Sequence, residues 1–290
     1  MTILVAVASS LMWGVADFLG GKASRRLSAL LVVLISQATG LVAALLTATV
    51  TGSFRDPQGY LIWGAGAGLA GGCAVVLFYR ALAIGTMGVV APLAALGVIV
   101  PVVIGLFSGT MPSVVALVGI VVAIGGVVVT ARGNTSTARS PGHGRSIVLA
   151  LGSAVGFGLL QYAISGGSQY STVMTMVMMR VTSVPLLAVV AYTTLRKARG
   201  GSDVTGGGRR LPIWLLTLIA VIGLFDVSAN LLFAFATVSG ELAIVAVLGS
   251  LYPAVTVLLA KIIDHERMSR GQNFGVGVAL AGVAMIALGS

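Results

Sequence analysis

The sequence predicts an all-α polytopic membrane protein whose ten transmembrane helices form two inverted five-helix repeats. Its 290 residues are 58% apolar and 8% charged, whereas an average soluble domain has about 25% charged residues. The apolar residues form continuous runs of roughly 20, the length that a helix needs to cross a bilayer core of about 30 Å. These runs lack the alternation of polar and apolar residues that is typical of barrel strands. Composition and run length together therefore predict membrane-spanning helices.

The individual spans follow from cutting the chain at its polar, charged and Gly/Pro-rich stretches. Each remaining segment is apolar and close to the length of one crossing. In chain order the expected spans are 2–20, 28–50, 60–82, 88–108, 112–131, 146–165, 172–195, 211–235, 241–263 and 271–289.

A basic, Ser-, Thr- and Gly-rich stretch at 132–145 is the longest polar segment inside the chain and lies at its midpoint. We interpret it as a linker between a first repeat, 1–131, and a second, 146–290, with five spans each. Because five is an odd number, the two repeats must cross the membrane in opposite directions. Inverted repeats of this kind are typical of transporters, which bind substrate near the midplane where the halves meet.

Matching residues in the two halves support the repeat. The Trp13-Gly14 pair corresponds to Phe157-Gly158, and at the same offset Asp17 falls on Gln161. Further pairs follow in the same order along the chain: Gln37 with Arg180, Gly97/Pro101 with Gly249/Pro253, and Gly119/Gly126 with Gly275/Gly282.

Several chemistries are excluded by what the chain lacks. One cysteine and two histidines allow neither an internal disulfide nor a Cys/His metal cage, so we expect no metal and no cofactor. The spacing Gly66-x-Gly68-x-x-Gly71 fits a dinucleotide fingerprint, but it lies inside an apolar span with no preceding strand. No P-loop is present to drive an ATP-dependent pump.

The net charge of +10 comes from 17 basic and 7 acidic residues. In a chain this apolar, we interpret the basic excess as a topology signal and expect no nucleic-acid partner. Fourteen of the 17 basic residues fall in odd-numbered loops. Because basic loops stay in the cytoplasm, this bias predicts a plasma-membrane protein with both termini outside.

The C-terminal stretch 240–287 carries the most specific pattern, GELAIVAVLGSLYPAVTVLLA followed by KIIDHERMSRGQNFGVGVALAGVAMIA. It resembles the EamA repeat of the drug/metabolite transporter superfamily. The first half resembles the same repeat through Met12-Trp13-Gly14, Tyr79-Arg80-Ala81-Leu82 and Ala91-Pro92-Leu93. The halves depart from each other at one corner, where the second has Glu266-Arg267 and the first Thr110-Met111.

The resemblance implies ten helices in two inverted repeats, transport of a small metabolite by alternating access, and both termini inside the cell. The last point conflicts with the charge bias, so the orientation stays open. We expect a secondary active transporter, with export as the expected direction, and no enzyme activity. A lipophilic-cation efflux protein is the alternative, and an intramembrane enzyme is a more distant one.

Placing a polar side chain inside a membrane span costs free energy, so each such residue is a candidate for a functional role. The expected substrate pathway consists of Trp13, Asp17, Gln37, Gln161, Arg180, Asp226, Asn230 and Tyr252. Asp17, Asp226 and Glu241 are the candidates for proton coupling. The structural alternative is that Asp226 pairs with Arg180 only to hold helices together, and that Arg80 extends toward the interface.

A small-molecule substrate and the bilayer are the expected partners. No sequence feature points to a homodimer, so that question stays open. Four prolines inside spans, Pro92, Pro101, Pro185 and Pro253, predict helix kinks. Glycines spaced by four, such as Gly64, Gly68 and Gly72, predict close helix packing.

Overall fold

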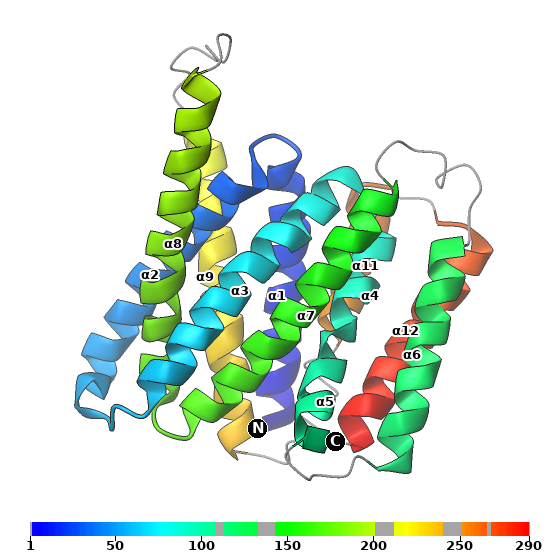
Figure 1. Ribbon diagram of the computed structural model, residues 1–290, viewed down its shortest axis with the longest axis horizontal. Helices are drawn as coiled ribbons and strands as arrows, with labels where there is room; N and C mark the ends of the chain where they lie inside the picture. The colour runs from blue at the N-terminus through cyan, green and yellow to red at the C-terminus, as the bar shows by residue number, and fades with distance from the viewer. Residues whose placement is uncertain are drawn as a thin grey trace.

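Long helices running alternately up and down make up the computed structural model (Figure 1). The structure describes residues 2–107, 113–132, 143–200, 212–239, 251–265 and 268–289, and these contain no strand. The helices are α1 (Thr2–Ser24), α2 (Ala29–Thr51), α3 (Tyr60–Ile84), α4 (Met87–Ala95), α5 (Ile99–Phe107), α6 (Val114–Arg132), α7 (His143–Ser168), α8 (Thr172–Gly200), α9 (Ile213–Ser239), α11 (Tyr252–Ile263) and α12 (Arg270–Gly289). Two short 3₁₀ turns, η1 (Ser53–Arg55) and η2 (Leu96–Val98), accompany them.

The prediction of an all-helical, polytopic chain is confirmed. Six of the described helices, α1, α2, α3, α7, α8 and α9, are long and apolar enough to cross a membrane, and shorter apolar helices occur at 87–101, 114–126 and 252–263. Each of the ten expected segments coincides with helix, although the ninth is described only from residue 251 onward.

The outer surface of this bundle is apolar, as a lipid-facing surface must be. Side chains such as Val50, Ile62 and Phe107 are 87%, 85% and 90% exposed. Exposed apolar surface on this scale marks a contact with membrane or protein. The side chain of Arg80, on α3, is also exposed.

The fourth expected span is broken rather than continuous. Helix α4 ends at Ala95, η2 forms a tighter turn, and α5 begins at Ile99. Pro101 has no N–H with which to bond the carbonyl of Gly97, the residue four positions earlier. The Gly97 carbonyl lies against Gly158 of α7, where a side chain would clash with it. The expected kink therefore lies at a contact between α4–α5 and α7.

Pro253 differs from the expectation of a kink inside a span. Helix α11 begins at Tyr252, so Pro253 occupies the first turn of the helix. An N–H in that turn has no partner within the helix, and the proline ring therefore costs nothing there. Two more of the prolines expected to bend spans do lie inside helices, Pro92 in α4 and Pro185 in α8.

The helices pack in specific pairs. Helix α1 packs on α9 and α11, α3 packs on α7 and α8, α2 packs on α8 and α9, and α6 packs on α12. Figure 1 shows the α6–α12 pair at one edge of the bundle. Glycines permit its close approach, because a Cβ on Gly126 would lie 2.7 Å from the Cα of Ala279. A Cβ on Gly282 would lie 2.6 Å from the Cα of Ala123.

One end of the bundle carries charged side chains that bridge helices. Lys22 Nζ lies 2.6 Å from Asp264 Oδ1, and Arg25 Nη1 lies 3.3 Å from Asp264 Oδ2. These contacts join the end of α1 to the end of α11. The two chain termini lie together at the opposite end (Figure 1).

Candidate functional site

A cavity opens among α1, α2, α3, α7, α8, α9 and α11, about halfway along the bundle. The space between its lining atoms is about 730 Å³, open mouth included. The lining residues are Trp13, Asp17, Gln37, Gly71, Gly72, Val75, Tyr79, Phe157, Leu160, Gln161, Ile164, Met179, Arg180, Ser183, Asp226, Asn230, Phe233 and Tyr252.

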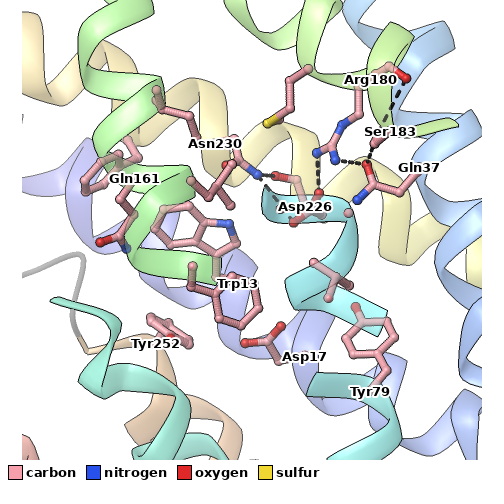
Figure 2. A pocket seen from close by; sticks show the side chains of 18 residues that line it. Trp13, Asp17, Gln37, Tyr79, Gln161, Arg180, Ser183, Asp226, Asn230 and Tyr252 are labelled. Atoms are coloured by element: carbon pink, nitrogen blue, oxygen red, sulfur yellow. Dashed lines mark hydrogen bonds and ion pairs between the residues drawn. The ribbon is translucent and has the colours of Figure 1, made fainter. Parts of the chain in front are cut away.

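Arg180 is the centre of the polar network in the cavity wall (Figure 2). It belongs to α8, and only 3% of its surface is exposed. Its Nη1 donates to Gln37 Oε1 on α2, and its Nη2 donates to Asp226 Oδ2 on α9. Ser183, one turn further along α8, donates to the same Gln37 oxygen at 3.4 Å. Two helices are thereby bonded to α8, and the guanidinium charge is compensated by Asp226.

The orphan polar atoms of this network lie on Asn230 and Arg180. Asn230 Nδ2 donates to the Asp226 carbonyl oxygen at 2.7 Å and to Asp226 Oδ1 at 3.4 Å. Asn230 Oδ1 and Arg180 Nε are buried and have no hydrogen-bond partner among the described residues. Buried polar atoms are normally satisfied. Arg180 Nε lies against Gly40 of α2, whereas Asn230 Oδ1 is left to accept a bond from water or from a ligand.

Asp17 lies in the same cavity but outside this network. In the part of the chain that the structure describes, its carboxylate has no hydrogen bond and no ion pair. Figure 2 shows it apart from the Arg180–Asp226 pair, beside the labelled rings of Trp13, Tyr79 and Tyr252. An unpaired carboxylate inside a membrane helix is costly, which makes Asp17 a candidate to bind a proton or a cation.

Aromatic side chains form the wall next to Asp17. The Trp13 ring lies 5.3 Å from that of Phe233 on α9 and 6.0 Å from that of Tyr252 on α11, measured between ring centroids. Trp13 and Asp17 are four residues apart on α1 and share a helix face. On α3, the Tyr79 hydroxyl donates to the Ala16 carbonyl at 3.4 Å.

Gly14 brings α11 to this wall. A Cβ at Gly14 would lie 2.8 Å from the carbonyl oxygen of Tyr252. In addition, the Thr256 hydroxyl donates to the Gly14 carbonyl at 3.2 Å. The glycine and the hydroxyl together hold the start of α11 against α1, and Tyr252 is placed beside Trp13 as a result.

All eight residues expected to form the substrate pathway line this one cavity: Trp13, Asp17, Gln37, Gln161, Arg180, Asp226, Asn230 and Tyr252. Glu241 lies outside the described residues. The ion pair of Asp226 with Arg180 is present, as the structural alternative required. The described residues contain no group of three His, Cys, Asp or Glu side chains that could hold a metal ion.

Sequence reasoning left several residues of the wall unassigned, among them Ser183, Tyr79 and Phe233. Ser183 could have been found as the polar residue one turn after Arg180 on the same face. Tyr79 was singled out only through the family pattern. Phe233 carried no signal, since one more phenylalanine in an apolar span is unremarkable.

Comparison with known proteins supports the sequence pattern. The EamA-like transporter family model matches residues 1–132 and again residues 144–288. A search of curated proteins finds no match. A solved crystal structure is similar over 98% of this chain and 96% of its own, with a TM-score of 0.63 and 16% identity. At that identity the likeness concerns the fold alone.

The two family matches cover nearly the whole chain, and the family consists of transporters rather than enzymes. The apolar helices agree with a multi-pass membrane protein. The chain belongs to the EamA-like transporter family of the drug/metabolite transporter superfamily.

Proposed function

We propose that the protein is a secondary active transporter that exports a small organic metabolite by alternating access through the central cavity. The observation that carries the proposal is the cavity itself, which is lined by polar side chains from both halves of the chain. A site enclosed by two sets of helices can open to either side when one set rocks against the other.

The pattern of helix contacts supports two inverted repeats. The proposed repeat pairs the helices in chain order: α1 with α7, α2 with α8, α3 with α9, α4–α5 with α11, and α6 with α12. When the members of each pair are exchanged, the contact of α3 with α7 becomes the contact of α9 with α1. The contact of α3 with α8 becomes that of α9 with α2, and the contact of α4 with α7 becomes that of α11 with α1. Both members of each pair are present. Such reciprocity is expected when two repeats are related by a two-fold axis.

Single residues follow the same exchange. A Cβ on Gly68 of α3 would clash with the Met179 carbonyl of α8, and a Cβ on Gly223 of α9 would clash with the Ser36 carbonyl of α2. Met179 and Ser36 are separated by the same interval, 143 residues, as Arg180 and Gln37. The Arg180–Gln37 contact therefore joins corresponding positions and lies at the proposed axis.

We propose Asp17 as the group that couples transport to protons. Asp226 is committed to Arg180 and Asn230, which leaves Asp17 as the carboxylate whose charge is uncompensated within the described cavity wall. Taking up and releasing a proton at this position would change the charge of the cavity in each transport cycle. Glu241 stays a candidate on sequence grounds.

We further propose a plasma-membrane location with both termini outside. Lys22, Arg25 and Lys261 lie near one end of the bundle, whereas both termini lie at the other (Figure 1). Since basic ends remain in the cytoplasm, the termini would face outward. The family resemblance implied the reverse.

The function is tested with purified protein in proteoliposomes that carry an imposed pH gradient. A panel of radiolabelled amines, amino acids and organic acids is screened for flux, with protein-free vesicles and a dissipated gradient as controls. Gradient-dependent flux of at least one compound is expected. Absence of flux for every compound, together with turnover of any of them in detergent, would contradict transport and favour an intramembrane enzyme.

A further inference from the structure

The cavity contains one carboxyl group without a counter-charge, Asp17, beside an aromatic wall. Resting on the proposed transport function, we propose that its substrates are organic cations: a protonated amine or other onium group on a small apolar body. Asp17 is the charge partner of that group, and Trp13 and Tyr252 are its aromatic neighbours.

The acidic and basic side chains of the cavity favour a positively charged substrate. The acidic and basic side chains that line the cavity are Asp17, Asp226 and Arg180. When both carboxyl groups are ionised, two carboxylates and one guanidinium leave one net negative charge, and the ion pair of Arg180 with Asp226 assigns it to Asp17. A cation entering the cavity would neutralise it. An anion would bring a second negative charge into a site of low dielectric constant, where like charges repel strongly.

Arg180 is the only side chain of the described wall that could bind a substrate carboxylate through two parallel hydrogen bonds. Its Nη1 and Nη2 already donate to Gln37 and Asp226. Its remaining nitrogen, Nε, lies 3.2 Å from the position that a Cβ on Gly40 would take, against the backbone of α2. Each Nη keeps a second N–H, but a carboxylate held by the two parallel bonds of an arginine would have to compete with Gln37 and Asp226 for the guanidinium. This disfavours an amino acid held by its carboxylate.

The aromatic wall beside Asp17 also favours a cation. Trp13 lies one turn from Asp17 on α1, and the centroid of the Tyr252 ring lies 6.0 Å from that of Trp13 in an edge-to-face arrangement. A cation next to the Asp17 carboxylate is therefore also next to these rings. The negative face of an aromatic ring attracts organic cations, best when the site is desolvated. The rings also supply the apolar contact that the body of the substrate needs.

The experiment uses three ligands that share one phenyl body: phenethylammonium as the cation, phenylalanine as the zwitterion and 3-phenylpropionate as the anion. Tetraphenylphosphonium serves as a second, larger cation. Binding to the full-length protein in nanodiscs is measured by isothermal titration calorimetry. We expect at least one cation to bind, and to bind more tightly than the zwitterion and the anion.

Variants separate charge recognition from structure. Asp17→Asn is expected to weaken cation binding by about tenfold to a hundredfold, the usual effect of losing a charged partner, whereas Asp17→Glu keeps it. Trp13→Leu should weaken it by about threefold to thirtyfold. Asp56→Asn removes a carboxylate outside the cavity, one that bonds Ser171, and should leave cation binding unchanged.

Three results would overturn the inference: binding of the zwitterion or the anion as tightly as either cation, unchanged cation binding in a monodisperse Asp17→Asn variant, or no binding of either cation. Gradient-driven transport of an amino acid or an organic acid alone would overturn it and leave the transporter function intact. Absence of any flux in the proteoliposome panel, together with turnover of a compound in detergent, would instead contradict the transporter function itself.

Discussion

Arg180 and Asp226 form an ion pair inside the helical bundle, and the arginine is almost completely buried whereas the aspartate is partly open to the cavity. The same guanidinium also bonds Gln37. The pair therefore fixes the relative position of α2, α8 and α9 and neutralises one of the two carboxylates of the cavity. This leaves Asp17 as the carboxylate of the described cavity wall without a counter-charge.

Removing the charge of only one partner of this ion pair should destabilise the protein. In the Asp226→Asn variant the buried Arg180 loses its counter-charge, a change that costs about 3–5 kcal/mol in buried pairs. We expect a clear fall in Tm, measured by thermal unfolding in detergent. The double variant Arg180→Met, Asp226→Leu removes both charges and should regain part of the loss. A double variant less stable than Asp226→Asn would contradict the account.

Removing the carboxyl group of Asp17 should abolish the response of transport to pH. Asn is nearly the same size but cannot take up a proton, so flux in Asp17→Asn proteoliposomes should no longer vary with the imposed pH gradient. Counterflow, which needs no gradient, reports whether the variant still binds and moves substrate. A pH response equal to that of the unmodified protein would exclude Asp17 as the coupling group.

The contact of Asp264 with Lys22 and Arg25 should affect opening more than stability. Ion pairs exposed to solvent contribute about 0–1 kcal/mol, so Asp264→Asn should leave Tm nearly unchanged. Because the contact joins α1 to α11 at the basic end, its loss should favour opening there.

Opening can be followed with a cysteine at Phe18, which is buried on α1, after the single native cysteine, Cys73, is replaced by serine. A membrane-impermeant thiol reagent added from the basic side should label Phe18→Cys faster when Asp264→Asn is also present. Equal labelling rates would argue against a role for the pair in closure.

Adjacent glycines on α6 offer a matched test of helix packing. A Cβ on Gly126 would meet the backbone of α12 at Ala279, whereas a Cβ on Gly125 would meet nothing within 4 Å. Gly126→Ala should therefore cost about 1–3 kcal/mol, as overpacking does, and lower Tm. Gly125→Ala should leave Tm unchanged or raise it slightly. Equal effects would mean that α6 and α12 are not packed this closely.

The orientation is settled by reporter fusions at the C-terminus. The charge bias predicts that a fused alkaline phosphatase, active only outside the cytoplasm, is active and that a fused green fluorescent protein is dark when exported unfolded. The opposite pattern would place both termini inside.

Much of the fold was predictable because the bilayer imposes a simple rule of length and apolarity on every span. The same rule made Asp17, Arg180 and Asp226 conspicuous in apolar surroundings. The pairing of Arg180 with Asp226 was foreseen only as one alternative, because the sequence also allows a bond to Asp17, and the packing of α8 on α9 decides for Asp226.

The features that could not be predicted depend on tertiary contacts, which leave no periodic pattern in the sequence. Pro253 looks like an interior kink in the sequence but occupies the first turn of α11. The aromatic wall depends on Gly14, whose missing side chain lets α11 approach. A glycine in an apolar span fits any close contact, so its partner could not be named in advance.

The contact between Gln37 and Arg180 bears on how such a chain can evolve. If the halves arose by duplication of an ancestral gene, the ancestral dimer would have had identical residues at this point. Two arginines would repel each other, and two glutamines would leave Asp226 without a counter-charge. Divergence after fusion allows one copy to carry the cation and the other its acceptor. A single half expressed alone therefore lacks the means to rebuild the centre of the cavity by self-association.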